Sequence, residues 1–202
     1  SGNHAGADDV NDLTVTFANE AFVGDDASAI AHSTKSDLKI DLHDDAPAGA
    51  APNYTQAFDD ATGFAEFTKY SGDADTLKSW SLNATEKAAE VNGYGSSAPA
   101  DDWLVSKAFD LDGTNAEFLS FRTWTQYTDN GNAQPLALKY STDYSGTGDP
   151  ALATWQDLPF TASPQASQQW TDSELIDLSG ISGTNVYFAF QYKSSGGTSS
   201  TA

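Results

Sequence analysis

The loop 141–150, with the sequence STDYSGTGDP, contains the side chains best suited to bind an ion. Asp143 and Asp149 flank turn-forming residues, and serine and threonine hydroxyls lie close by. Calcium is a hard cation that takes about six to eight oxygen ligands from carboxylates, carbonyls and water. The loop therefore predicts a calcium site at Asp143 and Asp149, although its spacing matches no EF-hand. The alternative is a hydrogen-bonded hairpin loop in which Asp143 caps its own backbone.

Other candidates for chemistry are weaker. The segment DLDGTNAE (110–117) also has calcium-loop composition, and the histidines are His4, His32 and His43. No second histidine stands at ligand spacing, so the histidines are interpreted as residues of solvated loops. The chain contains no GxSxG, HExxH, P-loop or Rossmann fingerprint, which predicts a protein that is not an enzyme. A glycoside hydrolase built on a carboxylate pair remains the remote alternative, because any two of the 29 acids might converge.

The aromatic residues suggest a second kind of site, a platform on which sugar rings stack. Most of the tryptophans lie in strand-like phrases and are expected in the core; these are Trp80, Trp103, Trp124 and Trp155. Tyr127, Tyr144 and Trp170 lie in loop-like stretches. We therefore predict that these three residues are exposed and bind the ligand.

The charge balance limits the partners. The chain has 29 acidic and 9 basic residues, a formal net charge of -20 and a single arginine, Arg122. A nucleic-acid backbone or an anionic lipid surface would be repelled. Cations, neutral glycans and basic patches of a cell-surface protein remain as possible classes of partner.

Cysteine is absent from the chain. No apolar run reaches transmembrane length, so no membrane insertion is expected.

The elements that must position these side chains are short strands. Gly, Asn, Asp and Pro turns separate them, and no helical segment of useful length intervenes, which predicts an all-β, antiparallel sandwich. TEKAAEV (85–91) is interpreted as a strand or a single turn. The remaining expected strands are 13–17, 38–42, 64–70, 77–82, 103–106, 118–124, 136–141, 154–160, 174–178 and 185–192.

Two similar phrases bracket the candidate loop. FDLDGTNAEFLSFRTW (109–124) and IDLSGISGTNVYFAFQY (176–192) each place Asp-Leu-x-Gly before a strand. Asp110 and Asp177 are expected to accept backbone N–H bonds, while Gly113 and Gly180 allow a positive φ. We call these two Asp-Leu-x-Gly turns the corners. Each corner should be followed by a core strand, one in each sheet.

The Pro/Ala/Gly-rich segment DDAPAGAAPN (44–53) is the best linker candidate. It divides the chain into an N-terminal extension (1–50) with one or two strands, which is expected to pack on the main domain, and the main domain itself (51–202). The chain begins at Ser1 and has no methionine, which indicates a processed product or a fragment.

Three phrases carry a family resemblance: GYGSSAPADDWLVSKAFDL (93–111), YSTDYSGTGDPALATWQDL (140–158) and DLSGISGTNVYFAFQY (177–192). Residues 54 to 193 resemble the choice-of-anchor J and cleaved-adhesin families of secreted bacterial proteins. Asp102-Trp103-Leu104 matches the family phrase, whereas Lys107 stands where proline is usual.

The resemblance implies a jelly-roll sandwich, similar to carbohydrate-binding modules, in which calcium ties the first strand to the last. QAFDDATGF (56–64) would be the first strand, which implies Asp59 or Asp60 as a metal ligand, with an exposed acidic turn as the alternative. Family members close with a strand that contains Trp and Asp. This chain reaches SSGGTSSTA (194–202) without it, so the final strand is expected to be missing.

Together these features predict a non-catalytic, calcium-stabilised binding or adhesion module of a larger protein, secreted or displayed at the cell surface. The main alternative is a glycan-binding accessory module that targets a neighbouring enzyme domain of the same polypeptide.

Overall fold

A computed structural model describes residues 54–72, 78–96, 98–112, 117–129 and 132–195, and the backbone of three earlier strands. Antiparallel strands dominate these residues, and the helices are only single turns. The prediction of an all-β, antiparallel fold is confirmed.

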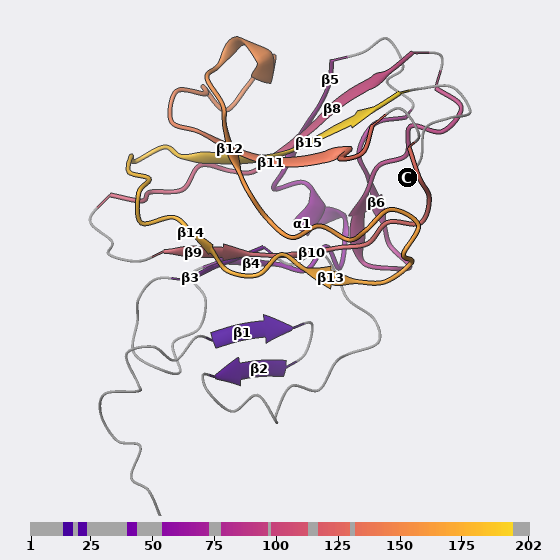
Figure 1. Cartoon of the computed structure of the whole chain (residues 1–202). Helices are drawn as coiled ribbons and strands as arrows, with labels where there is room; N and C mark the ends of the chain where they lie inside the picture. The colour runs from indigo at the N-terminus through magenta and orange to yellow at the C-terminus, as the bar shows by residue number, and fades with distance from the viewer. Residues whose placement is uncertain are drawn as a thin grey trace, which may run out of the picture.

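Two sheets face each other as an upper and a lower layer (Figure 1). The five-stranded sheet has the order β12 (Gln156–Leu158), β11 (Leu136–Ser141), β15 (Tyr187–Ser194), β8 (Ala100–Val105) and β5 (Thr68–Ser71). The four-stranded sheet has the order β14 (Ile176–Asp177), β9 (Phe118–Ser120), β3 (Ile40–His43) and β4 (Tyr54–Gln56).

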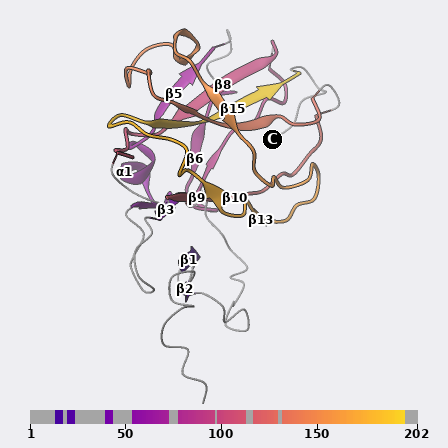
Figure 2. The ribbon, with the colours of Figure 1, turned by 60° about the vertical axis from the view of Figure 1, so that its left-hand side comes forward.

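Smaller elements complete the described structure. Three two-stranded ladders pair β1 (Thr14–Phe17) with β2 (Glu20–Val23), β6 (Ser81–Asn83) with β7 (Ala88–Glu90), and β10 (Arg122–Thr123) with β13 (Thr171–Asp172). The helical turns are α1 (Ala61–Phe64) and the 3₁₀ turn η4 (Pro150–Leu152). The helical turn α1 lies between the two layers (Figure 2).

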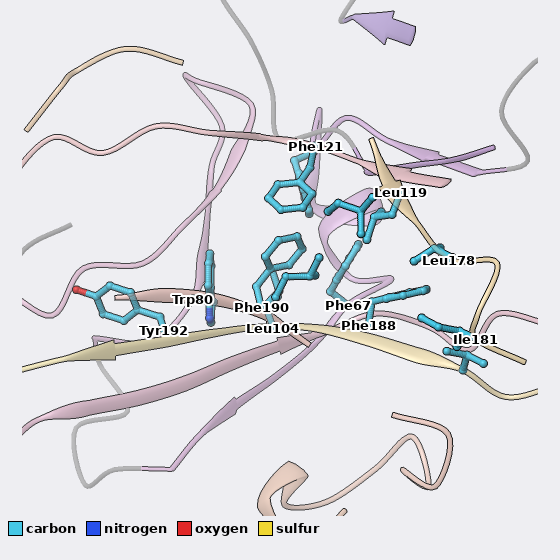
Figure 3. Packing of buried hydrophobic residues seen from close by; sticks show 14 of the residues in the cluster. Phe67, Trp80, Leu104, Leu119, Phe121, Leu178, Ile181, Phe188, Phe190 and Tyr192 are labelled. Carbon is cyan, nitrogen blue, oxygen red and sulfur yellow. The ribbon is translucent and has the colours of Figure 1, made fainter. Parts of the chain in front are cut away.

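The hydrophobic core fills the space between the sheets (Figure 3). Leu119 and Phe121 from the β9 segment point toward Leu104 and Phe190 of the five-stranded sheet. The rings of Phe121 and Phe190 meet edge to face, with centroids 4.9 Å apart. Such an edge-to-face contact adds to the stability gained from apolar burial.

Strand β8 is buried on both faces. Leu104 points into the core, whereas its neighbours Trp103 and Val105 point to the opposite face and belong to a second apolar cluster. Successive side chains of a strand alternate between faces, so the outer face of the five-stranded sheet must also be covered here. The segment 142–155 provides this cover through Tyr144, Ala153 and Trp155.

A β-bulge interrupts the edge of the four-stranded sheet. Leu119 pairs with Ile176, and Arg122 pairs with Asp172. The segment from Leu119 to Arg122 is therefore one residue shorter than the segment from Asp172 to Ile176 that lies opposite it. Phe121 lies opposite the extra residue, and its N–H donates to the Ser173 hydroxyl at 3.0 Å. A bulge of this kind bends the strand and redirects the side chains beyond it. The predicted single strand 118–124 is therefore divided into β9 and β10.

The prediction of a strand over 64–70 is wrong in its first half, and 56–64 does not form a first strand. β4 ends at Gln56, and Phe58 has a φ of 50°. Asp60 then caps α1, because its carboxylate accepts the N–H bonds of Thr62 and Gly63 at 2.8 and 2.9 Å. The strand β5 begins only at Thr68.

The two predicted corners are confirmed in part. Asp110 and Asp177 accept the N–H bonds of Asp112 and Ser179. The strands that follow them, β9 and β15, belong to different sheets as expected. The positive φ of the second corner occurs at Gly183 rather than at Gly180, so that detail was wrong.

The strand β3 comes from the predicted N-terminal extension, yet it lies inside the four-stranded sheet. It pairs with β4 on one side and with β9 on the other. The first 50 residues therefore contribute an interior strand. The linker 44–53, Gly113 and the side chains of the three histidines lie outside the described residues.

Candidate functional site

A group of accessible aromatic side chains lies beyond the bulge, on the segments that flank the ladder of β10 (Arg122–Thr123) and β13 (Thr171–Asp172). We call Trp124, Tyr127 and Trp170 the aromatic strip. Trp124 keeps 40% of its surface exposed and Tyr127 keeps 49%, while Trp170 is half-buried. Exposed aromatic rings on neighbouring segments of a rigid fold are candidates for a binding surface.

Alternation along the backbone explains why these rings face outward. Thr123 is buried, and its hydroxyl accepts the Ser163 N–H at 2.8 Å. The side chains on either side of it, Arg122 and Trp124, must therefore point to the opposite, outer face. Thr123 pairs with Thr171, so Trp124 and Trp170 occupy the next opposing positions and share that face.

The two segments continue side by side beyond the ladder. The N–H of Gln168 donates to the carbonyl of Thr125 at 3.1 Å, and the N–H of Ala166 donates to the carbonyl of Tyr127 at 2.9 Å. Ala166 and Gln168 both have positive φ values, 58° and 52°, which are uncommon for residues other than glycine. Surrounding contacts must hold such a backbone in place.

Buried Ser163 provides much of this support. Its hydroxyl accepts the Thr125 N–H at 3.2 Å and donates to the Gln169 carbonyl at 3.0 Å. The same hydroxyl lies 2.8 Å from that of Ser167. Ser163 thus links the segment that carries Trp124 to the segment that carries Trp170. These hydrogen bonds order the backbone of the strip, and a preordered backbone lowers the entropy cost of binding.

An ion pair lies beside the strip. Arg122 Nε is 2.7 Å from Asp172 Oδ1, and the guanidinium carbon is 6.0 Å from the centre of the Trp170 ring. A cation at this distance from an aromatic face is attracted by the ring and helps to orient it. The strip therefore places a charged pair beside accessible aromatic ring faces.

A second aromatic group lies on the outer face of the five-stranded sheet. We call Trp103, Tyr144, Trp155 and Tyr187 the covered cluster. The Tyr144 ring packs against Trp155 and Tyr187, with centroid distances of 5.5 and 5.3 Å. Tyr144 is only 5% exposed, so the prediction that it is an exposed contact is wrong. The loop folds back over the sheet and uses this ring as its own anchor.

The predicted calcium ligands of this loop accept hydrogen bonds from the loop itself. Asp143 Oδ1 accepts the Ser141 hydroxyl at 2.7 Å and the Thr154 N–H at 2.9 Å. Both bonds lower the pKa of Asp143, and the bond from Ser141 has the larger effect. Asp149 Oδ1 accepts the Ala151 N–H at 2.9 Å and caps η4. A hydrogen bond with Asp149 also raises the pKa of Tyr70.

The other two predicted ligands also contact protein groups. Asp59 forms an ion pair with Lys87 at 2.9 Å, and Asp60 caps α1. Within the part of the chain that the structure describes, no group of three or more His, Asp or Glu side chains is arranged to hold a metal ion. Calcium binding at these four residues stays a prediction.

The sequence indicated part of the strip. Tyr127 and Trp170 were predicted as exposed ligand contacts, and the structure leaves both at least partly accessible. Trp124 was assigned to the core because it ends a strand-like phrase. The missed signal was the alternation from Leu119 and Phe121, both buried, which places position 124 on the opposite face.

No protein family model matches the chain, and no curated protein matches it. Among the described residues, no helix is long and apolar enough to span a membrane.

Proposed function

We propose that the chain is a non-catalytic, extracellular binding module of a larger secreted bacterial protein, and that its aromatic strip binds a glycan. One observation carries the proposal: Trp124 and Tyr127 lie exposed and Trp170 is half-buried, on a backbone that Ser163 holds in place. The C–H faces of sugar rings stack on aromatic faces, whose electron-rich surface attracts them. Nearby polar side chains then select the hydroxyl pattern.

The fold proposed for this module is a jelly roll. Two facing antiparallel sheets and short connecting ladders are compatible with it, and the family resemblance of residues 54–193 favours it. Loops and surfaces on a rigid sandwich commonly carry the binding function. The same architecture suits an accessory domain that brings a neighbouring enzyme domain to its substrate.

A glycan array tests the proposed function. The unmodified protein is expected to bind a subset of glycans, and Trp124→Ala and Trp170→Ala should each weaken that binding about tenfold or more. Tyr94→Ala is the matched control, since Tyr94 is an exposed aromatic residue outside the strip. Absence of glycan binding by the unmodified protein would contradict the proposal, and so would an equal loss with the Tyr94 variant.

We also propose that calcium stabilises the module, on the basis of its acidic loops. A ligand that binds only the native state raises the melting temperature by mass action. The melting temperature in excess calcium should therefore exceed that in a chelator. Equal melting temperatures would refute calcium stabilisation without affecting the glycan proposal.

A further inference from the structure

We infer that the aromatic strip selects uncharged glycans over acidic ones. Asp172 sets this selectivity because it forms an ion pair with Arg122, the arginine beside the rings. The inference rests on the proposed glycan binding and adds the class of glycan and the residue that determines it.

The arginine is the group that an acidic sugar would otherwise use. Its planar guanidinium binds carboxylates in a two-pronged geometry, and Arg122 is the single arginine of the chain. Arg122 Nε already lies 2.7 Å from Asp172 Oδ1. A sugar carboxylate would have to displace a carboxylate that the protein holds in place.

Accessibility reinforces this effect. The Arg122 side chain is only 12% exposed, whereas that of Asp172 is 46% exposed. A ligand that approaches the strip therefore meets the carboxylate before the guanidinium. Two negative groups placed together cost binding energy, and the net charge of -20 adds long-range repulsion.

An uncharged sugar gains from the same arrangement. The exposed Asp172 carboxylate accepts hydrogen bonds from sugar hydroxyls, and a charged acceptor strengthens them. Asp172 pairs with Arg122 on the face that carries Trp124 and Trp170, so hydroxyl recognition and ring stacking act on one ligand. Asp172 is thus a specificity-determining residue rather than only a partner in a surface ion pair.

The test compares neutral and acidic oligosaccharides of equal length. Calorimetry at low ionic strength measures the binding of cellohexaose, xylohexaose, mannohexaose and hexagalacturonate. The unmodified protein is expected to bind a neutral oligosaccharide at least about tenfold more tightly than hexagalacturonate. Asp172→Asn should improve hexagalacturonate binding about tenfold, because it removes the negative charge that a sugar carboxylate meets beside Arg122.

Asp157→Asn is the matched control. Asp157 pairs with Lys139 on the β11–β12 ladder, so this change also removes the acidic partner of a cation and shifts the net charge equally. It is expected to leave hexagalacturonate binding unchanged. Asp172→Ser is a second variant that should reproduce the gain, and circular dichroism confirms that each variant is folded.

The outcomes separate the inference from the proposed function. Equal binding of neutral and acidic oligosaccharides by the unmodified protein overturns the selectivity but leaves the strip as a glycan site. Equal behaviour of the Asp172 and Asp157 variants overturns the role of Asp172. Failure to bind any glycan, both here and on the array, overturns the proposed function and this inference with it.

Discussion

The covered cluster and the aromatic strip use the same residue types but differ in what covers them. In the covered cluster, the segment 142–155 folds over the sheet, and the hydroxyl of Tyr144 donates to the Gly148 carbonyl at 3.0 Å. The indole N–H of Trp155 donates to the Pro150 carbonyl at 2.8 Å. In the strip, buried Ser163 holds the backbone through hydrogen bonds, and the rings of Trp124 and Tyr127 stay exposed.

The difference shows that aromatic content by itself does not identify a binding site. Rings that anchor their own loop contribute to folding, because their apolar surface is already removed from water. Rings that keep an exposed face, as Trp124 and Tyr127 do, retain that surface for a ligand. A substitution in each group should therefore affect a different property, stability in one case and binding in the other.

The largest expected effect is on stability, at Tyr144. Tyr144→Ala should lower the free energy of unfolding by about 3 kcal/mol, because it leaves a cavity beneath the loop. Tyr127→Ala in the strip should change it by less than about 0.5 kcal/mol. Urea unfolding followed by circular dichroism measures both values.

Tyr144→Phe separates packing from hydrogen bonding. It keeps the ring and removes the bond to Gly148, so about 1 kcal/mol should be lost. Similar losses for Tyr144→Ala and Tyr127→Ala would contradict the distinction between the two groups.

A smaller effect is expected at Ser163, which is buried and supports the strip. Ser163→Ala should lower the free energy of unfolding by about 1–2 kcal/mol, because buried hydrogen-bond partners are left unsatisfied. Glycan affinity should fall as well, because the segment that carries Trp170 becomes less ordered. Unfolding and calorimetric titration of the same sample measure the two effects.

The control for Ser163 is Ser145→Ala. Ser145 is exposed, and its hydroxyl donates to the Thr147 carbonyl in the loop over the covered cluster. This variant should keep both full stability and full glycan affinity. If Ser163→Ala changed stability but left affinity intact, the rings would not depend on the support of Ser163.

The smallest expected effect is the pH dependence of the loop over the covered cluster. The pKa of Asp143 is lowered in the folded protein, so its stabilising contribution is present above the ordinary carboxyl pKa. It is lost as the pH falls through that value and below it. Melting temperatures measured from about pH 6 to about pH 2 should fall less steeply for Asp143→Asn. Parallel curves for the two proteins would contradict this contribution.

Some of this structure followed from local sequence patterns. Strand β11 begins and ends at Leu136 and Ser141, as predicted from its alternating residues and its flanking turns. Such patterns report backbone conformation and the side of a strand that is buried. Tyr127 and Trp170 were recognised as candidate contacts for the related reason that turn-rich segments lie on the surface.

Other features depend on contacts between distant residues. The bulge opposite Phe121 arises where Ser173, 52 positions along the chain, replaces a regular ladder partner. The burial of Tyr144 requires Tyr187 of another strand to lie beneath the loop. The local sequence does not predict either contact, because both join residues far apart in the chain. The exposed position of Trp124 was in principle predictable, because it needed only the alternation to be continued from Phe121.

One measurement tests most directly whether the strip, rather than the covered cluster, binds the ligand. The five tryptophans provide five indole N–H signals in a nitrogen–proton correlation spectrum, assigned through single Trp→Phe variants. During titration with the neutral oligosaccharide that binds most tightly, the signals of Trp124 and Trp170 should shift. Those of Trp80, Trp103 and Trp155 should stay in place. Shifts confined to Trp103 and Trp155, or no shifts at all, would contradict the proposal that the aromatic strip is the binding site.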